Sequence, residues 1–395
     1  AIKANAEDAL ATVSERIESR RHDHRVAAEA GWNSWYELWD GVDAKAVLEN
    51  AALAAKILKP LLPNGAPPLR IVVDDGWQLD WGDWRPNAKF PDGLDGLSKT
   101  LRADGFEVGV WLAPLLVRAE GELAKAHPDW LVGDATFHHI KMGTMAVLDV
   151  THPDAAAHLS DQVKQIVGWG LTLLKIDFLF VGTWEGSRQQ PMTGIESYNK
   201  ALAIIRAAAG PDVLLLAVGA PPVPSLRYVD GWRVGGDIAV ENFGAVWAFL
   251  PNELRTLGAR WPYCQVTLCD ADPVILRDLP QHEVDFGAWT AALAGGAVFL
   301  SDDLRKLPAE RHGWGLDKEI VAFGLAGHVW RPEHTLLEDP PLTLANAIFD
   351  HLKKESTHRL PHVWDLTHPT RLRFNPTDAA KEVDGVLVPA HSVSR

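Results

Sequence analysis

The segment that decides the fold is LTLLKIDF at residues 171–178, an apolar run that carries Lys175 and Asp177 near its end. A run this short and this rich in aliphatic residues is typical of a strand buried on both faces of a parallel sheet. On a strand, residues two apart share a face, so Lys175 and Asp177 would point to one side and Ile176 to the other. The segment therefore predicts a buried strand with two charged groups at its carboxyl end.

Similar apolar runs recur along the chain, and each is followed by a polar or glycine-rich loop and then by a helical period. The runs lie at residues 32–36, 69–73, 107–112, 171–178, 213–218, 231–234, 265–269 and 297–300. Apolar residues at helical spacing lie at 44–58, 154–169, 195–209 and 283–294. This alternation predicts an α/β fold, a closed (β/α)8 TIM barrel rather than an open sheet. A further run at 145–150 predicts a short extra strand.

The barrel pattern occupies only part of the chain. Residues 1–30 are rich in alanine and charge and predict a helical lead-in, and residues 31–326 carry the catalytic barrel. Residues 327–395 contain proline-rich loops and two strand-like pieces at 370–374 and 385–389, which predict a small β appendage, complete or incomplete.

Charge and composition narrow the class of ligand. The net charge of -14 disfavours nucleic acid and anionic membranes and suits a neutral substrate. The chain has 17 Trp against 4 Tyr, and tryptophan is common where the apolar face of a sugar is stacked, although packing would account for about half of them. No run approaches the roughly 20 apolar residues of a membrane helix.

The two cysteines, Cys264 and Cys269, flank a predicted strand and lie five residues apart. An odd spacing on a strand directs two side chains to opposite faces, so we expect no mutual disulfide. With no secretory signal near Ala1, this favours a reducing, cytoplasmic setting.

Acidic residues stand at or just after five of the predicted strands, where a barrel carries its catalytic groups. They are Asp74–Asp75, Asp177, Asp237, Asp270 with Asp272, and Asp302–Asp303. Each one alone is explained equally well as a cap of the following helix. A ring of acids indicates either a metal site or recognition of hydroxyls combined with acid–base chemistry. Because the histidines lie mostly away from the strand ends, with His138–His139 expected in a solvated loop, we predict no metal and no cofactor.

Two of these acids have informative neighbours. Lys175 beside Asp177 would hold that carboxylate ionised, as a nucleophile or a sugar-binding acid requires. The alternative is an ion pair that only fills the barrel. Gly235 and Gly236 before Asp237 would let the backbone approach a ligand closely, and the alternative is a solvated turn.

A series of motifs then runs in a recognisable order. They are GWNSWY at 31–36, DDGWQ at 74–78, GDW at 82–84, FP at 90–91, GVWLAP at 109–114, HPDW at 127–130, KIDFLF at 175–180, VDGWRVGGD at 229–237, DAD at 270–272 with ILR at 275–277, and SDD at 301–303. Over about residues 30–305 the chain resembles glycoside hydrolase family 36, especially its shorter bacterial α-galactosidases.

The resemblance implies a retaining α-galactosidase that cleaves terminal α-galactosyl residues from oligosaccharides such as melibiose and raffinose by double displacement. The family's nucleophile falls on Asp177 and its acid/base on Asp237. Its substrate contacts fall on Asp74 and Asp75 (the galactose 4- and 6-hydroxyls), Trp111, Lys175, Arg233 and Trp35. We expect no nucleic-acid or membrane partner, and the oligomeric state stays open.

The chain departs from the family pattern in two respects. Val218-Gly219 stands where the family often has Cys-Gly, which leaves recognition of the sugar's 2-substituent open. Nothing before residue 30 could form the family's usual N-terminal β-sandwich, so either that domain is absent or this chain is a fragment. The alternatives are an α-N-acetylgalactosaminidase or a raffinose-synthase-like transglycosylase on the same scaffold, a metal-dependent barrel hydrolase, and a carbohydrate-binding protein without turnover.

Overall fold

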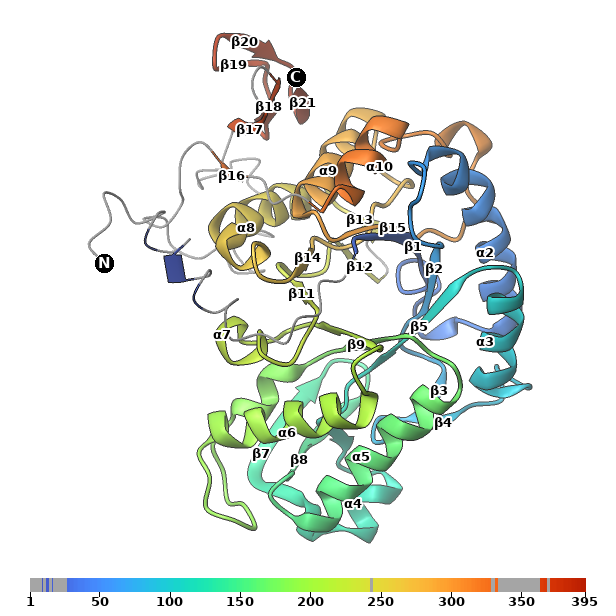
Figure 1. Ribbon diagram of the computed structural model, residues 1–395, viewed down its shortest axis with the longest axis vertical. Helices are drawn as coiled ribbons and strands as arrows, with labels where there is room; N and C mark the ends of the chain where they lie inside the picture. The colour runs from blue at the N-terminus through green and yellow to red at the C-terminus, as the bar shows by residue number, and fades with distance from the viewer. Residues whose placement is uncertain are drawn as a thin grey trace.

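The computed structural model describes residues 27–241, 244–327, 331–332, 363–367 and 370–395, and the single residues Ala9, Thr12, Val13 and Arg16. Its centre is an eight-stranded parallel sheet in the order β14-β11-β10-β9-β5-β2-β1-β15 (Figure 1). Two isolated parallel bridges, Cys269 to Gly295 and Val274 to Leu300, join the two ends of the sheet into a nearly closed barrel. The predicted (β/α)8 fold class is confirmed.

The barrel strands are short and mostly buried, because helices cover the outside and side chains fill the inside. They are β1 (Glu29–Asn33), β2 (Arg70–Val73), β5 (Glu107–Leu112), β9 (Leu173–Ile176), β10 (Leu214–Ala217), β11 (Gly231–Arg233), β14 (Leu268–Asp270) and β15 (Ala297–Leu300). Every residue of β2 and β9 is buried, as a strand covered on both faces requires. The parallel register pairs Trp111 with Lys175 and Arg233 with Asp270, which brings polar side chains to one level at the strand ends.

The first strand begins earlier than predicted, at Glu29 rather than at residue 32. Gly31 precedes the predicted apolar run at 32–36, but it lies within the strand. A Cβ atom at Gly31 would stand 2.0 Å from the carbonyl oxygen of Arg70, so close contact between β1 and β2 requires glycine there. The helical lead-in predicted for residues 1–30 lies outside the described residues, apart from four isolated helical positions and the start of β1.

Helices follow most barrel strands and pack around the sheet (Figure 1). The α-helices are α2 (Ala44–Leu58), α3 (Gly93–Ala103), α4 (Glu122–Ala126), α5 (Pro153–Gly168), α6 (Gly194–Ala209), α7 (Pro222–Ser225), α8 (Phe249–Cys264), α9 (Gln281–Ala294) and α10 (Lys318–Leu325). The 3-10 turns are η1 (Trp39–Gly41), η2 (Lys59–Leu61), η3 (Pro128–Trp130), η4 (Leu179–Thr183) and η5 (Ala309–Arg311). Helix α2 starts where Asp43 accepts a hydrogen bond from the amide of Ala46 at 2.7 Å, and it buries Val47, Ala54 and Leu58. None of the helices in these parts of the chain combines the length and apolarity needed to cross a bilayer.

Small antiparallel sheets are inserted after barrel strands, at the end where the acids lie. One hairpin is β3 (Gln78–Asp80) with β4 (Asp83–Pro86), and another is β12 (Ala239–Val240) with β13 (Gly244–Ala245). A three-stranded sheet consists of β6 (Leu116–Arg118), β8 (Gly143–Leu148) and β7 (Leu131–His139). The extra strand predicted at 145–150 corresponds to β8.

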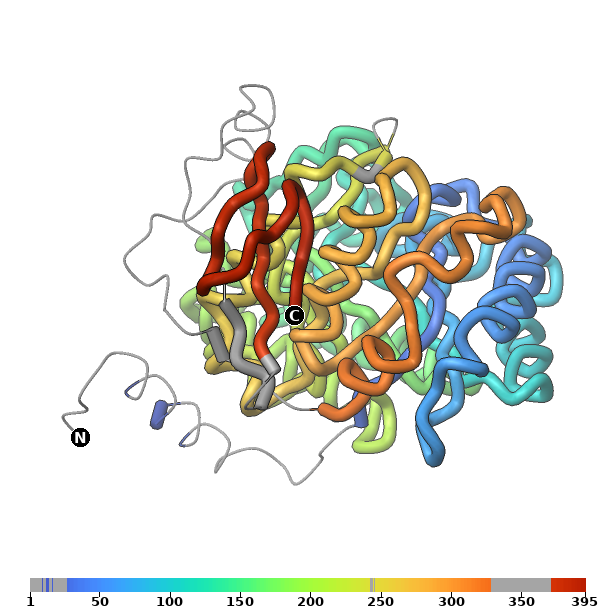
Figure 2. Tube along the Cα trace, turned by 90° about the horizontal axis from the view of Figure 1, so that it is seen from above, coloured from blue at the N-terminus to red at the C-terminus, as the bar shows by residue number. Residues whose placement is uncertain are grey.

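The chain ends in short antiparallel strands that pack beside α9 (Figure 2). These are β16 (Arg331–Pro332), β17 (Val363–Thr367), β18 (Thr370–Asn375), β19 (Lys381–Val383), β20 (Val386–Val388) and β21 (Ser392–Ser394). The ring of Phe374 packs against that of Phe286 with centroids 4.9 Å apart. His391 stacks on Trp247 and lies 2.7 Å from a Glu283 carboxylate oxygen. The β-rich character predicted for this end is confirmed for its described residues, and the exact division of the chain at residues 30 and 326 stays a prediction.

The two cysteines form a disulfide, so the prediction from their spacing was wrong. Cys264 is the last residue of α8 and Cys269 lies in β14, with Cα atoms 5.2 Å apart. The alternation rule applies along one continuous strand, but the predicted strand at 265–269 is mostly a turn between helix and strand. The expectation of a reducing, cytoplasmic setting rested on unpaired cysteines and loses that support.

The disulfide predicts a measurable contribution to stability. The bond closes a short loop of separation 5, for which the loss of loop entropy in the unfolded chain corresponds to about 2 kcal/mol. We therefore expect Cys264→Ser/Cys269→Ser to lower the Tm by a few degrees in a thermal melt. Reducing agent should lower the Tm of the unmodified protein similarly and leave the double variant unchanged. A Tm of the unmodified protein that does not respond to reductant would contradict the bond.

Candidate active site

The polar groups of the site gather at the carboxyl ends of the barrel strands. Asp74 and Asp75 follow β2, Asp177 follows β9, and Asp237 stands in the loop after β11. Asp270 ends β14. The strand ends thus bring together the acids that the sequence assigned to catalysis and to sugar binding.

Asp74 is the centre of a buried polar network. Lys175 Nζ lies 2.6 Å from Asp74 Oδ2, and Asn33 Nδ2 donates to the same oxygen at 2.8 Å. The amide of Asp75 donates to the other oxygen of Asp74 at 2.9 Å. Because the side chains of Asp74 and Lys175 are 3% and 8% exposed, this ion pair is fixed and desolvated. The direct ion-pair partner of Lys175 is therefore Asp74, and not Asp177 as the shared strand face suggested.

Asp177 lies partly buried just past β9. Trp111 Nε1 donates to its Oδ2 at 3.1 Å, and the amide of Phe178 donates to its Oδ1 at 2.5 Å. Phe178 has a left-handed backbone with φ of 53°, an uncommon conformation for a bulky residue that turns the chain sharply after the carboxylate. Burial raises the pKa of Asp177, and it outweighs the lowering effects of the Lys175 charge and the Trp111 hydrogen bond. The charge of Lys175 thus favours the ionised carboxylate, as expected, but burial is the larger effect and sets the direction of the shift.

Asp75 occupies a different environment from its neighbour. Gln78 Nε2 donates to its Oδ1 at 2.6 Å and Trp81 Nε1 at 3.3 Å. Its other carboxylate oxygen receives no hydrogen bond from the described residues. Burial raises the pKa of Asp75 to about 6, opposed by the hydrogen bond from Gln78. Asp75 is therefore oriented through one oxygen while the other can accept a hydrogen bond from a ligand.

Arg233 anchors the loop that carries Asp237. Its Nη2 lies 3.2 Å from Asp237 Oδ1 and 3.1 Å from the carbonyl oxygen of Gly236, and it pairs with Asp272. The Arg233 side chain is 1% exposed, whereas that of Asp237 is 54% exposed. Asp237 is thus the solvent-facing acid of the site, and its negative charge contributes to the raised pKa of Asp177.

Gly235 is required by packing behind this loop. A Cβ atom there would lie 1.7 Å from Glu253 Oε2, on α8. The sequence predicted that the glycine pair would let the backbone approach a ligand, but the close neighbour of Gly235 is a buried protein carboxyl. Burial raises the pKa of Glu253 to about 8, so it is mostly neutral at pH 7.

Asp272 and Tyr36 hold the loop that follows Arg233 through buried hydrogen bonds and an ion pair. The hydroxyl of Tyr36 hydrogen-bonds to Asp272 Oδ2, and the amide of Ile238 donates to the same carboxylate oxygen at 3.0 Å. Asp272 and Arg233 each have a side chain that is 1% exposed, and burial raises the pKa of Asp272 to about 7. Sequence reasoning did not single out Tyr36, although it ends the GWNSWY motif, because a hydrogen bond to a residue so distant in sequence leaves no local pattern.

Asp302 and Asp303 do not belong to the open site. The backbone amides of Leu276 and Arg277 donate to Asp302 at 2.8 and 3.0 Å. Arg305 Nε donates to Asp303 at 2.7 Å. Both acid side chains are 0% exposed. Both acids therefore hold neighbouring loops together, which is a structural role but not the capping of the following helix that was the alternative.

The two tryptophans expected to contact substrate differ in accessibility. Trp111 is 2% exposed, and its Nε1 atom orients Asp177. Trp35 is half-buried just after β1 and packs edge-on against Trp39 with centroids 5.0 Å apart. Trp35 therefore has the more accessible ring of the two.

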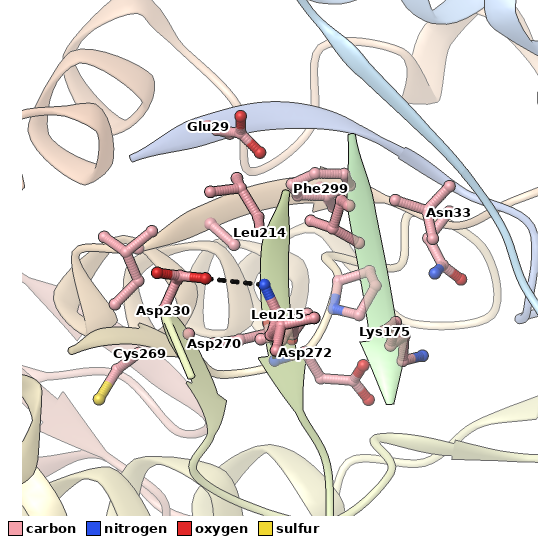
Figure 3. Close-up of a pocket in the computed structure, with 18 residues that line it drawn as sticks. Glu29, Asn33, Lys175, Leu214, Leu215, Asp230, Cys269, Asp270, Asp272 and Phe299 are labelled. Atoms are coloured by element: carbon pink, nitrogen blue, oxygen red, sulfur yellow. Dashed lines mark hydrogen bonds between the residues drawn. The ribbon is translucent and has the colours of Figure 1, made fainter. Parts of the chain in front are cut away.

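A cavity of about 60 Å³ lies inside the barrel below the acids (Figure 3). Asn33, Lys175, Asp270 and Asp272 line one end of it, and Glu29 lines the other. Neither Asp177 nor Asp237 is among its lining residues, so this cavity is the barrel interior and the two acids lie at the mouth above it. Within the described parts of the chain, no group of three or more His, Cys, Asp or Glu side chains has the arrangement of a metal site.

The sequence matches known proteins most strongly in the first half of the barrel. Residues 66–200 match the model of the Melibiase family, a span that contains Asp74, Asp75, Trp111, Lys175 and Asp177. The α-galactosidase AgaA of Geobacillus stearothermophilus is 30% identical over 105 residues, 25% of this chain and 14% of that enzyme. An α-galactosidase of Escherichia coli is 26% identical over 145 residues, 35% of this chain and 20% of that enzyme. The alignments therefore span a fifth or less of these curated relatives.

Solved structures extend the likeness over the barrel. TtGalA, an α-galactosidase from Thermus thermophilus solved with p-nitrophenyl α-D-galactopyranoside, is 28% identical with a TM-score of 0.64, covering 80% of this chain and 65% of that chain. The GH36 α-galactosidase AgaA from G. stearothermophilus has a TM-score of 0.56 at 18% identity, over 80% and 45% of the two chains, which is a likeness of fold alone. These findings confirm the resemblance found in the motifs: the chain is similar to the Melibiase family over residues 66–200 and to the TtGalA α-galactosidase structure over 80% of its length.

Proposed function

We propose that this protein is a retaining α-galactosidase. The observation that carries the proposal is the pair of carboxylates at the barrel mouth, with Asp177 held by Trp111 and Asp237 held by Arg233. The matched relatives named above are α-galactosidases, and TtGalA has also been solved with stachyose. Both support a neutral galactoside as the substrate.

In this proposal the galactosyl ring is bound by Asp74 and Asp75. Asp74 is held in place by Lys175 and Asn33, and Asp75 has one oxygen open for a hydrogen bond. Two adjacent carboxylates can accept hydrogen bonds from the 4- and 6-hydroxyls, and the axial 4-hydroxyl distinguishes galactose from glucose. The half-buried ring of Trp35 is suited to the apolar face of the sugar.

The proposed reaction is a double displacement. Asp177 attacks the anomeric carbon while Asp237 gives its proton to the leaving oxygen, so the glycosidic bond breaks and a covalent galactosyl-enzyme forms. Asp237, now a carboxylate, takes a proton from water as that water attacks the anomeric carbon and releases Asp177. Two inversions leave galactose in the α configuration. The exposure of Asp237 fits a group that meets both a leaving group and water.

The two sugar-binding acids give a quantitative prediction. Asp75→Ala should lower kcat/KM on galactosides by more than about 100-fold, because the hydroxyl contacts it makes tighten in the transition state. Asp74→Ala should do the same, and it should also lower the Tm, because it leaves Lys175 buried without its partner. Asp161→Ala, which removes an exposed carboxylate from α5, is the matched control. Normal kinetics in both variants would show that the sugar binds elsewhere.

A second prediction concerns pH. Asp75 and Asp177 both act as anions in this proposal, and burial raises the pKa of each, for Asp75 to about 6. We therefore expect kcat/KM to fall as the pH drops below about 6, well above the ordinary range of an aspartate. Gln78→Leu removes the hydrogen bond that lowers the pKa of Asp75 and should move this acid limb to higher pH. An acid limb near pH 4 in both proteins would contradict the assignment.

The direct test is release of p-nitrophenol from the aryl α-galactoside, compared with the α-glucoside and the N-acetylgalactosaminide. Preference for the galactoside supports the proposal, and preference for the N-acetyl sugar selects the alternative specificity left open by Val218-Gly219. Transfer of galactose to added sugar in place of water would select the transglycosylase. Activity lost to EDTA and restored by Zn²⁺ or Mn²⁺ would indicate a metal-dependent hydrolase, and binding without turnover would indicate a carbohydrate-binding protein.

A further inference from the structure

His139 stands at the end of β7, in the hairpin that this strand forms with β8. The sequence predicted a solvated loop for the pair His138–His139. His138 is exposed, but His139 is half-buried, because alternate residues of β7 face opposite sides. His139 therefore faces the protein while its neighbour faces solvent. The predicted loop was wrong for both residues, which lie in β7, and the predicted exposure was right only for His138.

The ring of His139 joins a group of aromatic side chains that begins at the proposed nucleophile. Its centroid lies 5.1 Å from that of Trp81 and 5.9 Å from that of Phe178, the residue after Asp177. Trp81 donates to Asp75 and packs against Trp111 with centroids 5.3 Å apart. His139 thus contacts Trp81, which donates to Asp75, and Trp81 in turn packs against Trp111, which donates to Asp177.

The hydrogen bonds of His139 determine which ring nitrogen carries the proton. Nδ1 accepts from the backbone amides of Lys141 and Met142 at 3.3 and 3.2 Å, so Nδ1 is unprotonated. Burial, together with the charges of Lys141 and His138, lowers the pKa of His139 and keeps the ring neutral at pH 7. The proton is then on Nε2, and this donor has no hydrogen-bond partner among the described residues.

The hairpin of β7 and β8 contacts the segment of the chain that follows Asp237. Lys141 pairs with Glu241, which follows β12 four residues after Asp237, and it lies 3.8 Å from Asp40. Asp237 is the group proposed to protonate the leaving oxygen. The turn after His139 therefore contacts the segment that follows Asp237 through Lys141, and the ring of His139 packs against Trp81.

We propose that His139 is a specificity-determining residue that binds the sugar on the leaving-group side, by donating a hydrogen bond from Nε2 to one of its hydroxyls. The half-exposed rings of Phe137 and Phe178, with centroids 5.6 Å apart, provide an apolar surface beside it. The ligand class is a neutral saccharide linked to the galactosyl group. This inference rests on the proposed function and adds the leaving-group half of the site to it.

The test compares two substrates that share the galactosyl group and differ in the leaving group. In His139→Phe an aromatic ring is kept, while the Nε2 donor and the Nδ1 acceptor of the Lys141 and Met142 amides are lost. Of these groups only the Nε2 donor would contact the substrate, so kcat/KM on melibiose should fall roughly tenfold, the value of one hydrogen bond. On p-nitrophenyl α-galactoside, whose leaving group has no sugar hydroxyl to bind, kcat/KM of the same variant should change less than about twofold. His139→Gln restores an N–H donor and should recover part of the loss on melibiose. The matched control is His138→Phe, which alters the exposed neighbour and should leave kcat/KM unchanged on both substrates.

The possible results separate this inference from the proposed function. Suppose that the unmodified protein hydrolyses the aryl galactoside, but His139→Phe lowers kcat/KM equally on both substrates or on neither. The inference is then overturned and the proposed function stands. If the unmodified protein hydrolyses no galactoside, the proposed function fails and the inference falls with it. A selective loss on melibiose supports both.

Discussion

Asp177→Gly is expected to be nearly inert, with kcat lowered by at least about 10⁴-fold even on activated aryl galactosides. The physical reason is that the first bond-forming step then has no attacking group, and a good leaving group cannot compensate for that. Trp111 and the amide of Phe178 now donate to the carboxylate, and both would lose their acceptor. The variant should still fold, which a thermal melt checks, because Lys175 keeps its partner Asp74.

Added azide distinguishes this loss from general damage. In Asp177→Gly the vacated space lies on the face of the sugar from which the nucleophile attacks, so azide entering there should give the inverted β-galactosyl azide. Asp177→Asn leaves no such space and should not respond to azide. Azide product of the α configuration from Asp177→Gly would contradict the assignment, because it would place the nucleophile elsewhere.

Asp237→Gly is expected to depend strongly on the leaving group. On melibiose, whose leaving oxygen must be protonated, kcat should fall by about 10²–10⁴-fold, the usual contribution of a general acid. On 2,4-dinitrophenyl α-galactoside the leaving group needs little protonation, so the first step should survive while the second, which needs a base, becomes slow. The covalent intermediate should then accumulate, visible as a burst of dinitrophenolate.

Azide should accelerate this variant, because it attacks the intermediate without a general base. Its product should be the retained α-galactosyl azide, opposite to that from Asp177→Gly. If the two variants give products of exchanged configuration, the roles of Asp177 and Asp237 are exchanged. If neither variant loses activity, the catalytic pair lies elsewhere in the barrel.

The barrel itself was predictable from the sequence because its signal is local. The strands expected at 107–112 and 297–300 are β5 and β15 without any shift, and the helix expected at 44–58 is α2. Short aliphatic runs and helical spacing report burial on one or two faces, and this depends little on distant residues. The fold class could therefore be read from the sequence alone.

The errors share a cause, which is contact between residues distant in sequence or across a turn. Lys175 was assigned to Asp177 because they share a strand face, but the side chain of Lys175 pairs with Asp74 on the far side of β5. The cysteines were judged as if on one straight strand, yet a turn brings Cys264 to Cys269. The sequence predicted where the strands end. It did not predict which side chains meet there, because that depends on the order of the strands in the barrel.

The position of the site was predictable for a related reason, whereas its internal arrangement was not. Acids at the ends of parallel strands must meet at one end of a barrel, and this alone brought Asp75, Asp177 and Asp237 together. Asp302 looked equivalent to these acids in the sequence, but its side chain is fully buried, so it is not part of the open site. Burial of a strand-end residue depends on which loops cover it, and the sequence pattern does not carry that information.

The most direct test of the central assignment is mass spectrometry of Asp237→Gly, quenched during turnover of 2,4-dinitrophenyl α-galactoside and digested to peptides. The assignment predicts one peptide heavier by a single galactosyl residue, the peptide that contains Asp177, with fragmentation locating the ester on that side chain. The adduct should disappear when azide is added before the quench. An adduct on any other carboxylate, or complete turnover with no adduct and an inverted first product, would contradict Asp177 as the nucleophile of a retaining enzyme.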